Sequence, residues 1–302
     1  MILVAGSANL DFVVRASHIP APGETVLGHG FKTFPGGKGA NQAVACAQAG
    51  GAATTMILAL GSDAFAVPLE ASLNTAGVRL HIKRVADQPT GTAFICVSDE
   101  AENAITVAPG ANNALRPEDM VPVADLAGFS HLLLQLETPM DTVNAFAQAA
   151  HQQGVKVVLN AAPAQSLSQD LLALVDVLIV NEGELAVLAN HAGSIEQCLE
   201  RIRVPCVVVT LGSRGTCARV GGQILRQPAF PVTPVDTTGA GDTFCGAFVA
   251  ALAHGEDVAN ALRQASAAGA LACTKPGAQS SIPTHAEVQT FLKNFSTSSL
   301  PP

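Results

Sequence analysis

The segment DTTGAGDTFCGAF, at 236–248, places two glycines and a carboxylate at the expected start of an amphipathic helix. Gly239 and Gly241 allow the backbone to approach a ligand closely. The unpaired N–H groups of Ala240, Gly241 and Asp242 would point outward at the positive end of the helix dipole, where anions bind. Asp242 could accept the proton of an attacking hydroxyl, so the segment predicts a phosphoryl-transfer site. The alternative is a plain turn in which Asp242 only complements the dipole.

A second glycine-rich segment, PGGKGANQAVACAQAG at 35–50, precedes another expected helix. Lys38 and Asn41 are three residues apart in its first turn, so both side chains can face one ligand. Lysine and asparagine both donate hydrogen bonds to hydroxyl groups. A glycine-rich loop with a solvated lysine is the alternative interpretation.

Several polar residues follow apolar strand-like runs. Asp11 follows the first run, Glu137 follows HLLLQL, and Asn181 with Glu184 follows VLIV. The segment TLGSRG at 210–215 adds a glycine-rich turn that could hold phosphates. A single carboxylate at a strand end is often only a helix cap. Open α/β sheets bind ligands at the carboxyl ends of their strands, so together these residues suit a buried ligand with many hydroxyls.

Other sites and partners are excluded or disfavoured by the sequence. GAGDTF lacks the third glycine of a dinucleotide fingerprint, and no GxxxxGK[ST] motif occurs. A net charge of −8 without a basic block argues against nucleic acid as a partner. The seven cysteines form no CxxC pair, so we expect most of them to be small buried residues. No apolar stretch reaches the roughly 20 residues of a membrane-spanning helix, and no secretory leader is visible, so we expect a cytoplasmic protein.

The rest of the sequence alternates apolar runs with helical periodicity. With 302 residues, 48% of them hydrophobic and 13% charged, the chain can bury a large core. Amphipathic stretches at 139–153 and 241–253 predict helices. Continuously apolar runs are typical of parallel strands covered on both faces, so we expect an α/β fold with a mostly parallel sheet. The strand candidates are Ile2 to Ala5, Thr54 to Ala59, His131 to Leu136, Val155 to Asn160, Val177 to Val180 and Cys206 to Thr210.

Two segments, 10–35 and 90–108, lack helical periodicity and contain Pro and Gly. The second resembles a hairpin around a polar loop at 98–103. We interpret both as a small β lid over one edge of the sheet; ordinary surface hairpins are the alternative. The expected division is an α/β core at 1–9, 36–89 and 109–293, a β lid at 10–35 and 90–108, and a disordered tail at 294–302.

The two glycine-rich motifs together identify a family. GGKGANQA and DTTGAGDTF, with LNAAPAQSL, VNEGE, VTLGSRG and KPGAQSSIP in order, resemble the ribokinase family of carbohydrate kinases over 1–293. The resemblance implies a three-layer αβα sandwich with a mostly parallel central sheet and a β lid, paired with a second lid in a homodimer. It also implies ATP-dependent phosphorylation of a primary hydroxyl of a sugar, with Mg2+ and a monovalent cation, usually K+.

The resemblance also assigns residues. Asp242 corresponds to the catalytic base, which also contacts the substrate. Gly239, Ala240 and Gly241 correspond to the anion hole. The sugar contacts would be Asn9, Asp11, Gly37, Lys38, Asn41 and Glu137. The nucleotide contacts would be Asn181, Glu184, Thr210, Gly212, Ser213, Gly215, Gly241 and Ser266, with Glu184 binding Mg2+ through water. The monovalent-cation site would comprise Asp236, Thr238, Ala272, Lys275, Gly277 and Ser281, mostly through backbone carbonyls.

One position departs from the family pattern. Ser266 stands where relatives often carry Asn or His beside the adenine or ribose of ATP, so nucleotide preference stays open. The predicted reaction transfers the γ-phosphoryl group of ATP to the 5-hydroxyl of D-ribose, giving D-ribose 5-phosphate. Alternatives are a kinase of deoxyribose, fructose or adenosine, or a non-catalytic sensor. A sensor has no need of a base, so the intact Asp242 and GAG turn argue against it.

Overall fold

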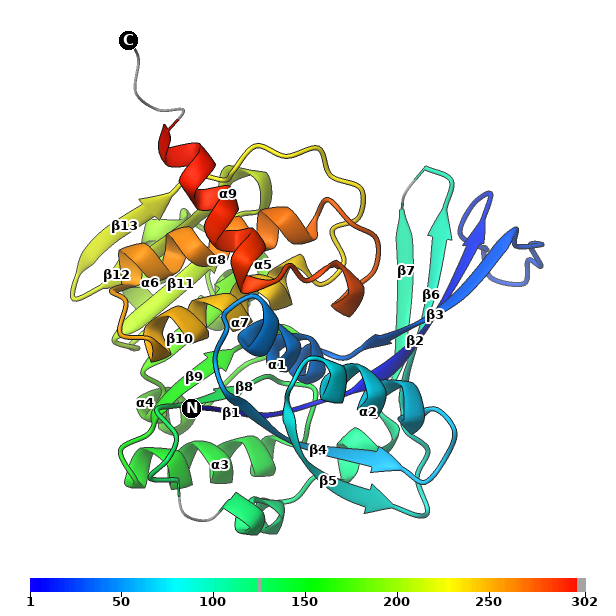
Figure 1. The fold of residues 1–302 in the computed structure, drawn as a ribbon, viewed down its shortest axis with the longest axis horizontal. Helices are drawn as coiled ribbons and strands as arrows, with labels where there is room; N and C mark the ends of the chain where they lie inside the picture. The colour runs from blue at the N-terminus through cyan, green and yellow to red at the C-terminus, as the bar shows by residue number, and fades with distance from the viewer. Residues whose placement is uncertain (101, 124–125, 298–302) are drawn as a thin grey trace.

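The computed structural model describes residues 1–100, 102–123 and 126–297 (Figure 1). Within these residues the main sheet has nine strands in the order β13-β12-β11-β10-β9-β8-β1-β4-β5. Strands β11 through β5 in that order pair in parallel, and among the described residues the antiparallel pairs of this sheet are β11-β12 and β12-β13 at one edge. The strands are β1 (Ile2–Ala5), β4 (Thr54–Gly61), β5 (Arg79–Val85), β8 (His131–Leu134), β9 (Lys156–Asn160), β10 (Val177–Asn181), β11 (Cys206–Thr210), β12 (Thr216–Val220) and β13 (Gln223–Gln227).

The sheet separates two apolar cores. Ile2 and Val4 of β1 point into one core, while Leu3 and Ala5 point into the other. This alternation explains why the central strands are apolar at every position, and the predicted αβα fold is confirmed. The first core is covered by α1 (Lys38–Gln48), α2 (Ala66–Thr75), α7 (Ala240–Ala253), α8 (Val258–Ala272) and α9 (His285–Thr297). The second is covered by α3 (Met140–Gln152), α4 (Gln169–Leu174), α5 (Glu182–Ala189) and α6 (Ile195–Arg201).

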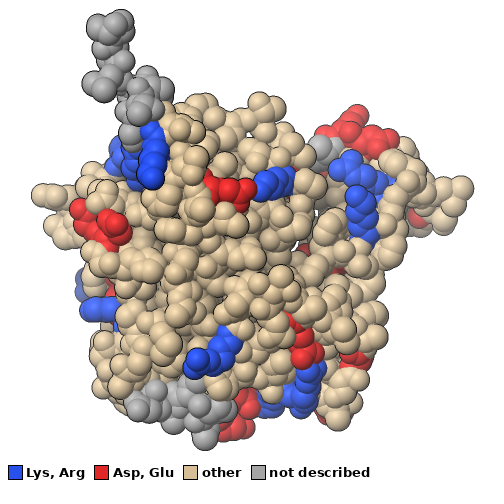
Figure 2. All heavy atoms as spheres, in the orientation of Figure 1, with Lys and Arg blue, Asp and Glu red and all other residues tan. Residues whose placement is uncertain are grey.

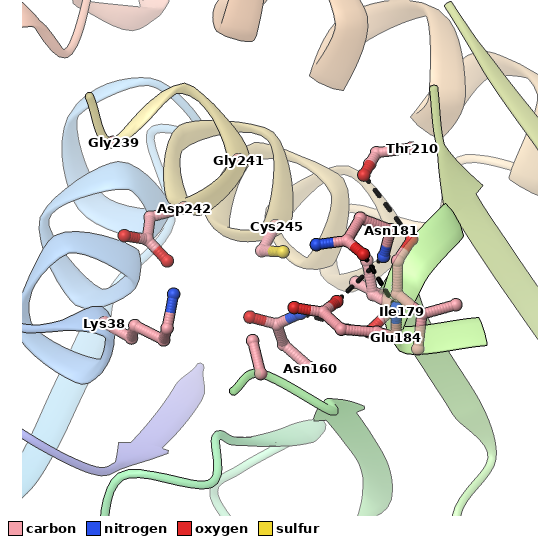
Figure 3. Close-up of a pocket in the computed structure, with 12 residues that line it drawn as sticks. Lys38, Asn160, Ile179, Asn181, Glu184, Thr210, Gly239, Gly241, Asp242 and Cys245 are labelled. Carbon is pink, nitrogen blue, oxygen red and sulfur yellow. Dashed lines mark hydrogen bonds between the residues drawn. The ribbon is translucent and has the colours of Figure 1, made fainter. Parts of the chain in front are cut away.

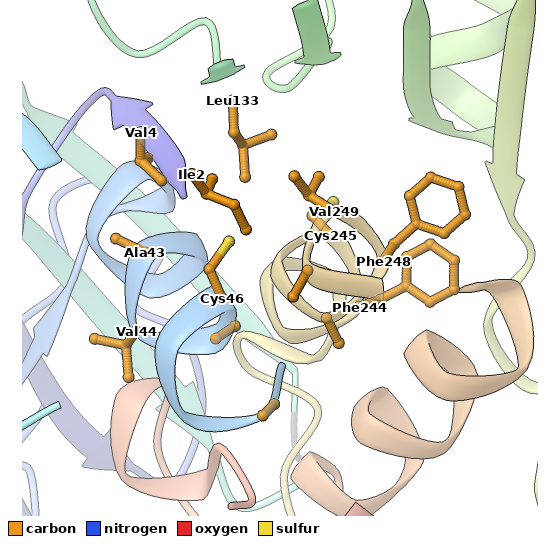
Figure 4. Packing of buried hydrophobic residues seen from close by; sticks show 14 of the residues in the cluster. Ile2, Val4, Ala43, Val44, Cys46, Leu133, Phe244, Cys245, Phe248 and Val249 are labelled. Carbon is orange, nitrogen blue, oxygen red and sulfur yellow. The ribbon is translucent and has the colours of Figure 1, made fainter. Parts of the chain in front are cut away.

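Helices α1 and α7 pack closely, and this contact builds the site. Gly246 of α7 lies so near α1 that a Cβ atom there would come within 2.5 Å of the Ala45 Cβ atom. Cys46 and Cys245 are buried in the same core (Figure 4). Small residues therefore let the two helices approach until their N-terminal turns share one edge of the sheet.

A second sheet lies at the side of the main body, with the order β3-β2-β6-β7 (Figure 1). Its strands β6 and β7 form the hairpin predicted for 90–108. Strand β2 follows β1 after three residues, so one continuous segment links both sheets. That this sheet acts as a lid stays a prediction. The strands are β2 (Asn9–Ala16), β3 (Gly30–Gly36), β6 (Gly91–Ser98) and β7 (Asn103–Ala108).

Some boundaries differ from those predicted. Strands β5, β12 and β13 were not expected; they lie at the edges of the main sheet, where charged residues interrupt the apolar pattern. The predicted strand at 131–136 ends at Leu134. The prediction of a disordered tail was wrong for 294–297, because α9 continues to Thr297. The rest of that predicted tail, 298–302, lies outside the described residues. Within the described part of the chain, short 3-10 helices also connect other elements: η1 (Gly110–Ala114), η2 (Pro117–Val123), η3 (Gly212–Arg214) and η4 (Gln279–Ser281).

The surface carries few charges. On the face in Figure 2, Lys and Arg lie singly or in small groups, interspersed with Asp and Glu. No helix within the described ranges has the length and apolar character needed to cross a membrane. All seven cysteines are free thiols, and five of them are buried.

Candidate active site

A cavity of about 170 Å3 lies at the carboxyl ends of the central strands, beside the first turn of α7 (Figure 3). Its walls come from α1, β9, β10, β11, α5 and α7, as expected for an open α/β sheet. The lining residues are Lys38, Asn160, Ala162, Ile179, Val180, Asn181, Glu184, Thr210, Gly239, Gly241, Asp242 and Cys245.

The first turn of α7 is shaped by glycine. Gly239 precedes the helix with a left-handed φ of 73°, and a Cβ atom there would lie 3.0 Å from the Ala278 Cα atom. The prediction of three free N–H groups was wrong for Ala240, because its N–H donates to the Thr237 carbonyl (3.2 Å). The N–H groups of Gly241 and Asp242 have no acceptor among the described residues, so these two are available to an anion.

Asp242 is held by two side chains of α1. Its Oδ2 atom accepts a hydrogen bond from Asn41 Nδ2 (2.9 Å), and its Oδ1 atom accepts one from Gln42 Nε2 (2.8 Å). The amine of Lys38 points toward the same carboxylate (Figure 3). The charge of Asp242 raises the pKa of Lys38 above its ordinary value against the opposing effect of burial, and Glu137 and Glu184 add to this. Lys38 is therefore a cation inside a cluster of carboxylates.

Two more carboxylates approach this cluster from the second sheet and from the loop after β8. Glu137 Oε2 accepts hydrogen bonds from Ser7 Oγ (2.5 Å) and from the Lys38 N–H (3.1 Å). Asp11 is buried, and burial, with the charges of Glu137 and Asp242, raises its pKa to about 7. Near neutral pH, such a buried carboxyl group can ionise and accept hydrogen bonds from the hydroxyls of a bound ligand.

Two other predicted sugar contacts, Asn9 and Gly37, lie where β2 meets the start of α1. Asn9 Oδ1, at the start of β2, accepts a hydrogen bond from Asn112 Nδ2 of η1 (2.8 Å). Gly37 has a left-handed φ of 88°, and a Cβ atom there would lie 2.7 Å from the Ala8 Cα atom. The strand β2 and the N-terminus of α1 are thus in contact, which brings Asn9, Gly37 and Lys38 to one place.

The predicted nucleotide residues lie on the opposite wall. Asn181 and Glu184 form a reciprocal capping box at the start of α5, with both hydrogen bonds at 2.8 Å. Burial raises the pKa of Glu184. Asn181 pairs with Thr210 across the ends of β10 and β11, and all three side chains line the cavity. The capping box accounts for part of this motif structurally, and it also fixes Glu184 at the cavity wall.

The remaining nucleotide residues are placed differently. Gly212 and Ser213 lie in the exposed helix η3 after β11. Gly215 has a left-handed φ of 91°, and a Cβ atom there would meet the Gln227 carbonyl at 2.2 Å, so its glycine is required by packing. Ser266 of α8 is buried outside the cavity lining, and its Oγ atom has no partner among the described residues.

The predicted cation residues lie around the loop before α7. The Asp236 carboxylate accepts hydrogen bonds from the Gly277 N–H (2.8 Å) and from the N–H (2.9 Å) and hydroxyl (2.7 Å) of Thr238. Burial opposes ionisation of Asp236, but these hydrogen bonds outweigh it and lower its pKa. Lys275 pairs with Glu287 (3.0 Å), so its side chain is engaged elsewhere.

The backbone around this loop is tightly connected. The Val235 N–H donates to the Cys273 carbonyl (2.7 Å), and the Lys275 N–H donates to the Ala272 carbonyl (3.3 Å). Ser281 is buried, and its hydroxyl donates to the Ala278 carbonyl.

Among the described residues no group of three or more His, Cys, Asp or Glu side chains could hold a metal ion. Backbone oxygens beside one ionised carboxylate suit a weakly bound monovalent cation better than a transition metal.

Sequence reasoning missed several residues of the site. Gln42 contacts Asp242, Asn160 lines the cavity, and Ser7 holds Glu137. Asn160 ends β9, so the rule that singled out polar residues at strand ends would also have found it. Gln42 directly follows Asn41 in the GGKGANQ segment, but nothing in that spacing indicates a contact with Asp242.

The fold and site together define a class of protein. A helix N-terminus that presents free N–H groups, an acidic acceptor and a lysine at the carboxyl edge of a parallel sheet is typical of α/β phosphotransferases. Residues 1–285 match the pfkB family of carbohydrate kinases, and the chain belongs to this family. The family resemblance expected from the two glycine-rich motifs is thereby confirmed.

Individual relatives cover almost the whole chain. A ribokinase from Haemophilus influenzae is 40% identical over 97% of this chain and 98% of its own length. A ribokinase from Bacillus subtilis is 38% identical over 96% of this chain and 99% of its own. A ribokinase structure from Arabidopsis thaliana, complexed with ribose and ATP, superposes with a TM-score of 0.88 at 34% identity, covering 97% of this chain and 98% of that one.

Proposed function

We propose that this protein is a ribokinase that transfers the γ-phosphoryl group of ATP to the 5-hydroxyl of D-ribose, giving D-ribose 5-phosphate and ADP. The observation that carries the proposal is the position of Asp242. It lies at the N-terminus of α7, in one cavity with Lys38 and Glu184, and close enough to Asp11 to affect its pKa. The similarity to a ribokinase solved with ribose and ATP supports the same substrates.

The sugar would bind between the second sheet and α1. Asp11 and Glu137 would accept hydrogen bonds from ring hydroxyls, and the backbone at Gly37 lets the sugar approach closely. Asn41 already donates one N–H to Asp242 and accepts from Gln279, so only its second N–H remains for the sugar. These contacts would present the 5-hydroxyl to Asp242.

The transfer would proceed in line. The 5-oxygen forms a bond to the γ-phosphorus as the bond to the β,γ-bridging oxygen breaks, and ADP leaves. The hydroxyl proton passes to Asp242, late in a loose transition state. The N–H groups of Gly241 and Asp242, with Lys38, would stabilise the charge on the transferring group.

Two cations fit the residues present. Mg2+ would neutralise charge on the ATP phosphates. The carboxylate of Glu184 and the amide oxygen of Asn181 lie beside the anion site and would hold this ion through bridging water. K+ would stabilise the loop before α7, where ionised Asp236 and the backbone around Thr238 and Gly277 supply oxygens. The predicted contributions of Lys275 and Ser281 would come from their carbonyl groups, because both side chains are engaged elsewhere.

The second sheet would act as a lid and as a homodimer interface. Phe12, Phe31 and Phe94 share one face of it, with ring centroids 6.1 and 5.4 Å from Phe12, and the last two are exposed. An exposed aromatic row on a four-stranded sheet is the kind of surface that a second copy covers. Lid closure over the sugar would exclude water from the phosphoryl group. The expected cytoplasmic location stays a prediction.

A substrate panel tests the proposal. Purified protein with ATP and Mg2+ is offered D-ribose, 2-deoxyribose, fructose or adenosine, while ADP release is followed and the product is identified by phosphorus NMR. We expect the highest kcat/KM with ribose and a phosphate on its 5-oxygen. Asp242→Ala is the control, and it should lose at least about 100-fold in kcat. Preference for another acceptor, or turnover that is independent of Asp242, would contradict the proposal.

A further inference from the structure

Gln42, in the first turns of α1, is completely buried and is connected to three other polar side chains. Its Nε2 atom donates to Asp242 Oδ1 (2.8 Å) and to Asn160 Oδ1 (2.9 Å). Its Oε1 atom accepts a hydrogen bond from Gln135 Nε2 (2.7 Å). Every polar atom of this amide is therefore used, and one of its bonds goes to the proposed catalytic base.

The orientation of the Gln42 amide is fixed by its neighbours. Because Gln135 donates to the oxygen of Gln42, both N–H groups must point toward Asn160 and Asp242. Asn160 is oriented in turn, since its Nδ2 atom donates to the Ile179 carbonyl (3.0 Å). A reversed amide would place two donors or two acceptors face to face in a buried site, which costs free energy.

A second set of side chains holds the other oxygen of Asp242. Asn41 donates to Oδ2, its own oxygen accepts from Gln279 Nε2 (3.1 Å), and Gln279 accepts from Ser72 Oγ (2.6 Å). Rotation of the Asp242 carboxylate would break hydrogen bonds at both oxygens. The carboxylate is thus held in one orientation, with its remaining lone pairs available on the cavity side.

We propose that Gln42 is a positioning residue, which orients the Asp242 carboxylate toward the substrate hydroxyl without touching the substrate. This inference rests on the proposed function. Gln42 has no exposed surface and does not line the cavity, so it cannot contact sugar or nucleotide directly. Its effect on the reaction passes through Asp242.

The test replaces Gln42 by methionine, which keeps the length of the side chain and removes its hydrogen bonds. We expect kcat with ribose to fall on the order of 10- to 100-fold, since misplacement of a reacting group by about 1 Å costs that much. The KM for ribose should change less than about threefold, because no sugar contact is removed. Thermal unfolding identifies the folded fraction used for both constants.

The decisive comparison places Gln42→Met on an Asp242→Ala background. A positioning residue has nothing left to orient there, so the second substitution should leave the residual turnover unchanged. An additive loss in the double variant would mean that Gln42 acts by stabilising the fold, and would overturn the proposal. So would a single variant that retains kcat within about twofold of wild type.

Two further variants complete the design. Gln48→Met makes the same substitution on α1 at a partly exposed position outside the cavity lining, and it should leave kcat unchanged. If Gln42→Met does not fold, Gln42→Asn replaces it, because this shorter amide stays polar but cannot reach Asp242, and the same loss in kcat is expected. Absence of ribose-dependent turnover in wild type would contradict the proposed function instead, so the two failures are distinguishable.

Discussion

The Lys38 amine points toward the Asp242 carboxylate in the cavity wall, and the Asp242 charge is the largest of the effects that raise the pKa of Lys38. This pairing joins the N-terminal turns of α1 and α7, which lie about 200 residues apart in the chain. It also keeps one positive charge among three carboxylates, at the place where a transferring phosphoryl group would gather negative charge.

Replacement of Lys38 by methionine should therefore impair the reaction. The side chain keeps its length but loses the charge that would stabilise the transition state, so kcat should fall on the order of 100-fold. Steady-state ADP release with saturating ribose measures the loss. Lys32→Met, at an exposed position on β3, is the matched control and should remain close to wild type. Equal effects of the two substitutions would point to a general electrostatic effect instead of a local one.

The titration of Asp11 predicts how sugar binding depends on pH. With a pKa of about 7 in the free protein, only about one molecule in ten carries the ionised form at pH 6. Since the ionised carboxylate is the better acceptor for sugar hydroxyls, the KM for ribose should fall about tenfold between pH 6 and pH 8. Initial rates over this range give the profile. In Asp11→Asn the KM should be higher and should no longer show this dependence.

Ionisation of Asp11 should strengthen sugar binding but lower the stability of the folded protein. Folding raises the pKa of Asp11 from 3.8 to about 7, so the folded protein binds this proton more tightly than the unfolded chain does. The contribution of Asp11 to stability is thus greatest below pH 4 and is lost as the pH rises to about 7. Without sugar at pH 8, Asp11→Asn should unfold at a higher temperature than wild type. A lower temperature would mean that Asp11 has a stabilising partner when ionised.

Much of the fold could be predicted because its signals are local. The strands β1 and β11 are short continuous apolar runs and were predicted with their observed bounds. The start of α7 was indicated by its glycines. Strand β5 was missed because Arg79, His81 and Lys83 interrupt its pattern at the edge of the sheet.

The details of the site depend on contacts between distant segments. Gln42 lies 118 residues from Asn160 and 200 residues from Asp242, and the orientation of each amide follows from its neighbour. No spacing within the sequence encodes such a chain of hydrogen bonds. The engagement of the Ala240 N–H by Thr237 is local, but it depends on the left-handed conformation at Gly239, which the sequence permits without requiring.

The two glycines at the start of α7 should respond differently to substitution by alanine. In Gly239→Ala, the left-handed φ costs about 1–2 kcal/mol and the new methyl group crowds Ala278, so the protein should unfold at a lower temperature. In Gly241→Ala, the new Cβ atom has no neighbour within 4 Å, so stability should be kept. Since Gly241 lines the cavity, kcat should nevertheless fall.

Thermal unfolding and steady-state kinetics on both variants separate these effects. Each variant serves as the control for the other, because the substitutions are identical and only two residues apart. Full activity in Gly241→Ala would show that the N-terminal turn of α7 does not face the phosphoryl group. Loss of stability in that variant would contradict the open space at its Cβ position.

The exposed aromatic row on the second sheet predicts how the protein assembles. Phe31 and Phe94 are 64% and 54% exposed, and the strand register places both beside Val14 and Phe12 on one face. Burial of two such faces against each other would remove several aromatic rings from water, which favours association. We expect a dimer in sedimentation-velocity experiments, and a monomer after Phe31→Ser and Phe94→Ser are combined. Leu27→Ser, 90% exposed in the loop between β2 and β3, should leave the dimer intact.

Because a paired lid loses less conformational entropy when it closes, the monomeric variant should also show a higher KM for ribose with kcat little changed. Wild-type protein that sediments as a monomer at every concentration would exclude this assembly, and an unchanged KM in the monomeric variant would separate lid closure from dimerisation.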